Sequence, residues 1–196
     1  MPWICASTGA RVSEVVQLSK QDIDHSDWSR RFRERVPIIR FSLDACPLKG
    51  AEREIPVHPD LIKLGFLEFV AASSGERLFI DPSCRRSRSD VIGLTASAGR
   101  RIACWVRSLL PEDREVQPNH AWRHRFNDLC DAAQIYPEVR DCITGHTPAT
   151  VGATYGNKQP VVLRDWMRTM DSHLDLVEEL YPEIAAAEMR LSASGR

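Results

Sequence analysis

The chain has 196 residues, of which 43% are hydrophobic and 27% are charged, and its formal net charge is −1. These values are typical of a globular protein with one domain of ordinary size or two small ones. No apolar stretch approaches the ~20 residues that cross a bilayer, and no signal peptide is visible, so we expect no membrane partner and a cytoplasmic location. The six cysteines are scattered without a CxxC pair, which argues against a zinc ribbon and a disulfide scaffold.

The first 24 residues predict two short helices that are joined by a glycine turn. Residues 1–7 are typical of the end of a helix, and Gly9 is its expected stop. Residues 11–18 carry apolar side chains at helical spacing, and the polar run 19–24 ends that helix. We expect Asp22 to cap the turn that follows.

A β-hairpin is predicted next. Residues 36–43 and 53–57 are rich in β-branched and apolar side chains, and the segment 46–50 between them has the composition of a turn. Lys49 therefore lies near the tip of the expected hairpin.

The rest of the chain is predicted to be helical, apart from a loop-like stretch at 81–93 and a connector at 111–118. Asn119 is the expected N-cap of the helix that follows the connector. The expected helices span residues 58–73, 95–110, 120–133, 137–143, 147–156 and 161–180. The sum is an α+β fold, mainly α, with one small antiparallel sheet and one domain.

Charge is distributed unevenly along the chain. From residue 165 onward seven acidic residues stand against three arginines, which gives −4 and leaves +3 for the first 164 residues. Arginines cluster at 30–35, 84–88 and 99–101. A mildly basic body with an acidic C-terminal segment is compatible with binding a polyanion, although solvated arginine clusters are common.

Three segments carry the strongest functional signal: "TGARVSEVVQLSKQDID" (8–24), "PLKG" to "REIPV" (47–57), and "HAWRHRF" to "ITGHTPATVGATYG" (120–156). Together they resemble the tyrosine recombinase, or phage integrase, family over about residues 8–157. In that family an arginine follows a Thr-Gly turn, a lysine sits on a β-hairpin, and an H-x-x-R motif precedes a G-H motif and a tyrosine. The matching positions are Arg11, Lys49, His120, Arg123, His146 and Tyr155.

Two arginines and a histidine suit the task of holding a phosphodiester. Arginine forks onto non-bridging oxygens, a geometry that lysine does not copy, and preorganised cations offset the charge that develops on phosphorus. The resemblance implies that Arg11 and Arg123 clamp the scissile phosphate and that His146 donates a hydrogen bond to it. It implies no metal and no nucleotide cofactor.

The remaining positions suit nucleophilic attack and proton transfer. A tyrosine hydroxyl, with a pKa of ~10, is a poor nucleophile until nearby cations favour its phenolate. The resemblance implies that Tyr155 forms a 3′-phosphotyrosyl link, that Lys49 protonates the departing 5′-oxygen, and that His120 assists as acid and base. Lys20 and Lys63 fit the lysine's place less well, because one lies in a turn too early and the other on a helix.

Several neighbouring residues have expected supporting roles. Glu14 either pairs with a cation of the site or with a backbone group, or is a plain surface acid. Trp122 is expected to lie in the core, and His124 is expected either to pack inside the domain or to support a residue of the site.

The resemblance also implies a domain organisation and a partner. Residues 1–180 correspond to a catalytic domain that is truncated at its N-terminus and lacks the core-binding domain, and 181–196 form a tail. The implied partner is double-stranded DNA, on which the full-length protein forms a homo-tetramer. The alternatives are a type IB topoisomerase with the same chemistry, or a non-catalytic DNA-binding remnant of a mobile element.

Overall fold

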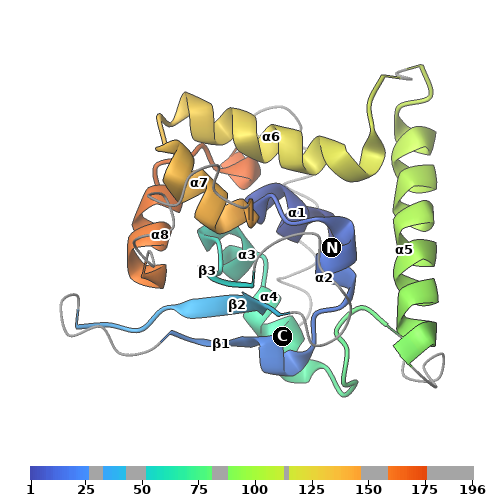
Figure 1. The fold of residues 1–196 in the computed structure, drawn as a ribbon, viewed down its shortest axis with the longest axis horizontal. Coiled ribbons are helices and arrows are strands. Elements are labelled where there is room, and N and C mark those ends of the chain that lie inside the picture. The colour runs from blue at the N-terminus through green and yellow to red at the C-terminus, as the bar shows by residue number, and fades with distance from the viewer. Residues whose placement is uncertain (27–32, 43–51, 81–87, 113–114, 147–158, 176–196) are drawn as a thin grey trace, which may run out of the picture.

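The computed structural model of the protein describes residues 1–26, 33–42, 52–80, 88–112, 115–146 and 159–175. It is mainly helical with one small antiparallel sheet, as predicted, and the sheet has three strands (Figure 1). In chain order the elements are α1 (Pro2–Thr8), α2 (Val12–Val16), the 3-10 turn η1 (Lys20–Asp22), β1 (Ile23–His25), β2 (Pro37–Phe41), β3 (Arg53–Pro56), α3 (Pro59–Lys63), α4 (Phe66–Ala72), α5 (Arg88–Leu109), α6 (Pro118–Ala132), α7 (Pro137–Thr144) and α8 (Pro160–Met167).

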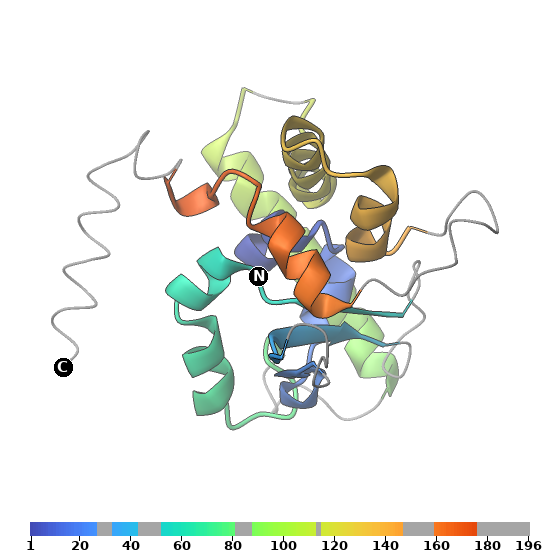
Figure 2. The same cartoon turned by 90° about the vertical axis from the view of Figure 1, so that its left-hand side faces the viewer.

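The sheet is buried on both faces at its central strand, β2. Ile39 pairs with Ile23 of β1 and with Ile55 of β3, and it belongs to the main core. Its neighbour Ile38 points to the other face and packs with Val161 of α8. Helix α8 therefore covers one side of the sheet, as Figure 2 shows, and the helical core covers the other.

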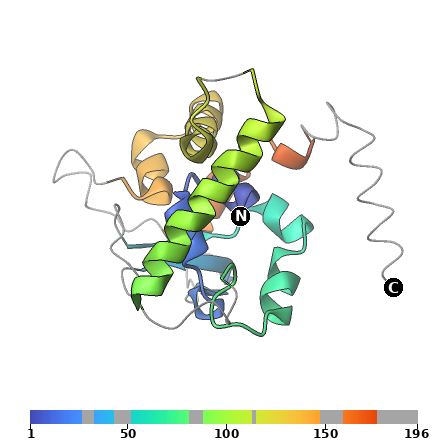
Figure 3. The same ribbon diagram turned by 90° about the vertical axis from the view of Figure 1, so that its right-hand side faces the viewer.

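The helices surround α1, which packs against α2, α3 and α6. Helix α5 packs against α2 and α6 and crosses one face of the molecule (Figure 3). One main hydrophobic core contains buried residues from Ile4 to Met170. Among the helices of the described residues, none is long and apolar enough to cross a membrane.

Proline and glycine mark several helix ends, including the predicted end of α1 at Gly9. Helices α6, α7 and α8 each begin with a proline in the first turn. Gly9 ends α1 with φ 62°. The predicted cap Asn119 is wrong: Gln117 is the N-cap of α6, because Pro118 already takes the first helical position. The Asn119 amide instead donates to the Gly99 carbonyl of α5 at 3.2 Å.

Three other expectations need correction. The single helix over 58–73 is divided into α3 and α4, because Gly65 adopts the left-handed conformation with φ 78°. Helix α5 begins at Arg88, so the loop expected over 81–93 is wrong for its last six residues. The last two residues of the polar run 19–24 belong to β1, which continues to His25 and pairs with β2 of the hairpin. The capping role of Asp22 is confirmed, since its carboxylate accepts from the amide and hydroxyl of Ser19, both at 2.7 Å.

The last described helix is shorter than predicted. The final helix expected over 161–180 ends at Met167, and the chain then turns back toward α3. There the Asp60 carboxylate accepts hydrogen bonds from the Ser172 hydroxyl and the His173 amide, both at 2.9 Å. Because Asp60 is buried, these bonds fix the direction of the chain after α8. Residues 176–180, like the helix expected over 147–156, lie outside the described residues.

Candidate functional site

Helix α6 presents Arg123 on its buried face. Arg123 is 8% exposed and shares this face with Phe126 and Cys130, three and seven residues further along. Trp122 is half-buried and packs against the core, as expected. His124 is exposed because its position on the helix points away from the core, so of its two expected roles the packing one is wrong.

The Arg123 guanidinium joins two turns that are far apart in the sequence. Its Nη1 donates to the carbonyl oxygen of Gly9 at 2.7 Å, and its Nη2 donates to the carbonyl oxygen of Thr144 at 2.9 Å. Nη2 also lies 3.0 Å from Nε2 of His146. The arginine and histidine of the H-x-x-R and G-H motifs are thus brought together, next to the Thr-Gly turn that precedes Arg11.

Both turns need glycine for two independent reasons. Gly9 and Gly145 have φ values of 62° and 71°, which favour glycine. A Cβ atom on Gly9 would lie 2.8 Å from both Phe126 and Thr144. A Cβ atom on Gly145 would lie 2.6 Å from Nη1 of Arg53. Gly9 therefore allows its turn to pack closely on Phe126 and Thr144, and Gly145 allows its turn to approach Arg53.

The surroundings of His146 fix its tautomer. Arginine has no hydrogen-bond acceptor, so the Nε2 atom of His146 accepts from Arg123 and its proton is on Nδ1. Nδ1 lies 3.1 Å from the hydroxyl of Thr144, which itself donates to the Arg140 carbonyl at 3.0 Å. Nδ1 is also 3.5 Å from the carboxylate of Asp141. Burial and the charge of Arg123 lower the pKa of His146, which favours this neutral form.

Arg11 is the N-cap of α2 and lies beside the buried carboxylate of Glu14. The Glu14 carboxylate accepts from the Arg11 amide at 2.8 Å, which holds the start of the helix. It lies 3.7 Å from the Arg11 guanidinium, whose side chain is 25% exposed while that of Glu14 is 1% exposed. Of the alternatives for Glu14, the surface acid is wrong: the carboxylate is buried and pairs with both a backbone amide and a guanidinium.

A third arginine, Arg53 of β3, completes the cluster. Its Nη1 and Nη2 donate to the two oxygens of Glu14 at 3.2 and 3.0 Å, and its Nε donates to the carbonyl oxygen of Ile143 at 2.9 Å. The guanidinium also lies over the Phe41 ring, 4.3 Å from the centroid. Arg53 therefore connects the sheet with α2 and with the end of α7.

The cluster has more positive than negative charge. Burial, and next the charge of Arg11, lower the pKa of Arg123 to about 10, so its guanidinium remains charged at neutral pH. Within the described residues, its hydrogen-bond acceptors are two carbonyls and an imidazole, all of them neutral. Buried charges in proteins are normally paired with an opposite charge, so this arrangement is suited to a bound anion.

The other predicted site residues are not part of the network around Arg123 or lie outside the described residues. His120 is exposed and lies one turn before Arg123 on α6, outside the hydrogen-bond network that joins Arg123 and His146. Lys49 and Tyr155 lie outside the described residues. In the part of the chain that is described, no group of three His, Cys, Asp or Glu side chains is placed to hold a metal ion.

Sequence reasoning missed Arg53 and Asp141. The signal for Arg53 was available: it alternates with Ile55 along β3, and alternate side chains of a strand share one face. No comparable pattern marks Asp141, because its proximity to His146 depends on the turn at Gly145.

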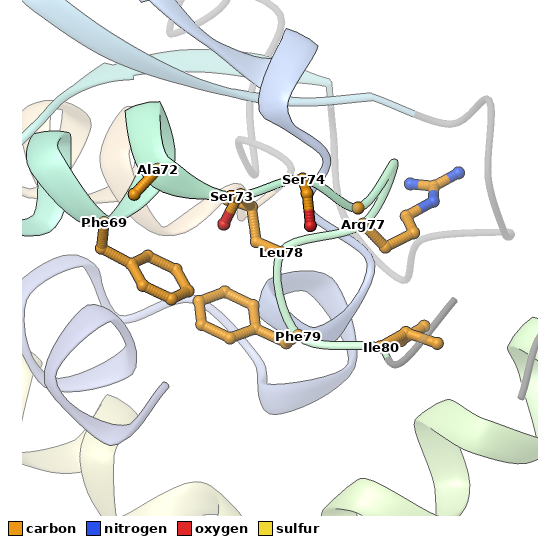
Figure 4. Close-up of a pocket in the computed structure, with 9 residues that line it drawn as sticks. Phe69, Ala72, Ser73, Ser74, Arg77, Leu78, Phe79 and Ile80 are labelled. Carbon is orange, nitrogen blue, oxygen red and sulfur yellow. The ribbon is translucent and has the colours of Figure 1, made fainter. Parts of the chain in front are cut away.

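A groove of about 490 Å³ lies elsewhere, along α4 and the segment that follows it (Figure 4). Phe69 and Phe79 stack at its edge, with ring centroids 5.8 Å apart. None of the three clustered arginines lines it, so it is separate from the site around Arg123.

Comparison with known proteins adds no assignment for this site. No protein-family model matches the chain, and no curated protein sequence matches it.

Proposed function

We propose that the chain is the catalytic domain of a tyrosine site-specific recombinase of the phage or prophage integrase type. In this proposal it cuts and rejoins double-stranded DNA in the cytoplasm, and the full-length protein acts as a homo-tetramer. The observation that carries the proposal is the environment of Arg123. A buried guanidinium with neutral acceptors, next to Arg11 and His146, suits a phosphodiester anion.

The proposed reaction begins with attack of the Tyr155 phenol oxygen on phosphorus. The bond from phosphorus to the 5′-oxygen breaks, and a 3′-phosphotyrosyl bond forms in its place. The phenol proton passes to His120, and Lys49 gives a proton to the 5′-oxygen. The reverse sequence rejoins the strand without ATP, because the phosphotyrosyl bond keeps the energy of the broken bond.

Arg11 and Arg123 supply the electrostatic part of this mechanism. Their guanidiniums enter from α2 and α6 and can each bind non-bridging oxygens. The proposed role of His146, donation of a hydrogen bond from Nε2, requires that this atom gain a proton or a new tautomer, because it accepts from Arg123 in the structure.

The test is trapping of the covalent intermediate. The full chain is incubated, with EDTA present, with nicked duplexes of randomised sequence that lose the short strand after cleavage. Protein–DNA adducts that survive SDS are digested, and mass spectrometry locates the nucleotide. We expect it on Tyr155, and we expect no adduct from Tyr155→Phe.

Tyr136→Phe is the matched control. Tyr136 is 62% exposed and packs edge-on against Trp166, and phenylalanine keeps that ring contact. This variant should form as much adduct as the unchanged protein. A nucleotide on Tyr136 or Tyr181 would contradict the proposal. Sequence-selective binding without adduct would favour the non-catalytic remnant, and relaxation of supercoiled plasmid without site preference would favour the topoisomerase.

A further inference from the structure

Arg53 has no role in the chemistry that the sequence motifs imply, yet it makes three hydrogen bonds inside the arginine cluster. It donates to both oxygens of Glu14 and to the Ile143 carbonyl, and its side chain is 6% exposed. Glu14 is the carboxylate that lies against both Arg11 and Arg53. To infer the function of Arg53, we therefore ask which partner the Glu14 carboxylate would bind if Arg53 were removed.

The distances show how the Glu14 carboxylate is shared. Arg53 holds it through two hydrogen bonds, at 3.0 and 3.2 Å, whereas the nearest guanidinium nitrogen of Arg11 is 3.7 Å away. That nitrogen, Nη1, is buried and has no hydrogen-bond acceptor among the described residues. Glu14 is thus bound mainly to Arg53, and Arg11 is left with unused donors.

The net charge of the cluster also depends on Arg53. Arg11, Arg53 and Arg123 contribute +3 and Glu14 contributes −1, so the cluster carries +2. Asp141 lies farther out beside His146, with a side chain that is 30% exposed. If Arg53 were uncharged, the cluster would carry +1, and Glu14 would be free to bind Arg11 at hydrogen-bond distance.

We propose that Arg53 is a positioning residue for the phosphate site: by pairing with Glu14 it prevents this carboxylate from neutralising Arg11 and Arg123. It also holds the Ile143 carbonyl, and its guanidinium occupies the space that a side chain at position 145 would need. This inference rests on the proposed function only in taking a phosphate as the anion.

The test is a double-mutant cycle with inorganic phosphate as the probe. The affinity is measured from the NMR shifts of the His146 ring at constant ionic strength for the unchanged chain, Arg53→Met, Glu14→Gln and the double variant. Opposite charges this close interact strongly at a partly buried site, so we expect Arg53→Met to weaken phosphate binding about tenfold. We expect Glu14→Gln to bind phosphate at least as tightly as the unchanged chain, and the double variant to recover most of the lost affinity.

If the Arg53–Glu14 pair only stabilises the fold, a different order of phosphate affinities is expected. Loss of either partner would then weaken phosphate binding, so Glu14→Gln would bind less tightly than the unchanged chain. Equal affinity in Arg53→Met and the unchanged chain would overturn the role of Arg53 while leaving the proposed recombinase untouched. If Arg53→Met does not fold, the inference is tested by comparing the phosphate affinity of Glu14→Gln with that of the unchanged chain. Weaker binding by Glu14→Gln contradicts the inference.

The adduct assay separates this inference from the proposed function. If the cycle behaves as expected but no nucleotide reaches Tyr155, the anion site stands and the recombinase assignment fails. If the unchanged chain shows no phosphate-dependent shift of His146, the anion site and the role of Arg53 both fail.

Discussion

Nη2 of Arg123 lies 3.0 Å from Nε2 of His146, and this one contact determines the protonation state of the histidine. The guanidinium only donates, so the imidazole is neutral with its proton on Nδ1, toward the Thr144 hydroxyl at 3.1 Å. The contact also brings the H-x-x-R and G-H motifs into one hydrogen-bond network with the Gly9 carbonyl.

The first prediction concerns the titration of His146. Burial and the charge of Arg123 lower the pKa of His146, and a bound anion offsets the effect of the Arg123 charge. We expect the midpoint to lie below the ordinary value of ~6.5 and to rise when sulfate is added, so sulfate binds more tightly at lower pH. NMR titration of the ring with and without sulfate measures this. In Arg123→Gln the midpoint should rise without sulfate, and an unchanged midpoint there would contradict the assigned cause.

The second prediction compares two arginines of the same helix. Arg123→Lys keeps the charge but loses the fork that reaches Gly9, Thr144 and His146, so we expect adduct formation to fall ~100-fold or more. Arg125 is exposed two residues further on, and Arg125→Lys should keep at least half of the adduct yield. Equal losses in both variants would show that general charge, and not the position of Arg123, determines the activity.

The third prediction concerns close packing at Gly145. Gly145→Ala combines a φ of 71° with a Cβ atom 2.6 Å from Arg53, and should lower the free energy of unfolding by about 2 kcal/mol or more. Gly93 of α5 is the control, because a Cβ atom there has no neighbour within 4 Å. Gly93→Ala should raise the free energy of unfolding by ~0.5–1 kcal/mol through helix propensity. Chemical denaturation measures both, and a neutral Gly145→Ala would contradict the described turn.

The fourth prediction concerns acid stability. His58 is 3% exposed, and burial lowers its pKa from 6.5 to about 4. The unfolded chain therefore binds a proton at pH values where the folded chain does not. The stability linked to His58 is fully present above pH 6.5 and is lost as the pH falls from there to about 4, with a total of about 3 kcal/mol.

His58→Asn tests this assignment. The His58 ring accepts from the Asp60 amide at 3.1 Å as the N-cap of α3, and asparagine also accepts at this position but does not titrate. The variant should show a shallower loss of stability between pH 6.5 and 4 in urea denaturation. His173, whose pKa burial also lowers, leaves a smaller slope in the same direction. An unchanged slope would exclude His58 as a cause.

Local chemistry made much of the fold predictable. Proline in the first turn marks the start of α7, and the left-handed glycines mark the ends of α1 and α7. The predictions were wrong where residues far away in the sequence determine whether a segment forms a strand or where a helix ends. The three residues of β1 form a strand because β2 pairs with them, and α8 ends early because Asp60 draws Ser172 and His173 back to α3.

The candidate site was predictable to a similar degree. The motif spacing predicted that Arg11, Arg123 and His146 have a common function, and the structure brings these three together. The spacing did not distinguish exposed His120 from buried Arg123 on one helix, nor did it reveal Arg53. Those distinctions depend on which face of an element meets the core, which is a property of the tertiary packing.

The joining of Gly9, Arg123 and Thr144 has a consequence for protein synthesis. Arg11 emerges from the ribosome 135 residues before His146, and translation at ~5–20 residues per second makes this interval on the order of ten seconds. Throughout that time the growing chain has at most part of the guanidinium cluster and no second turn to anchor it. In the proposed function, anion capture is therefore confined to chains whose synthesis has passed His146, which keeps incomplete polypeptides from engaging nucleic acid through this site.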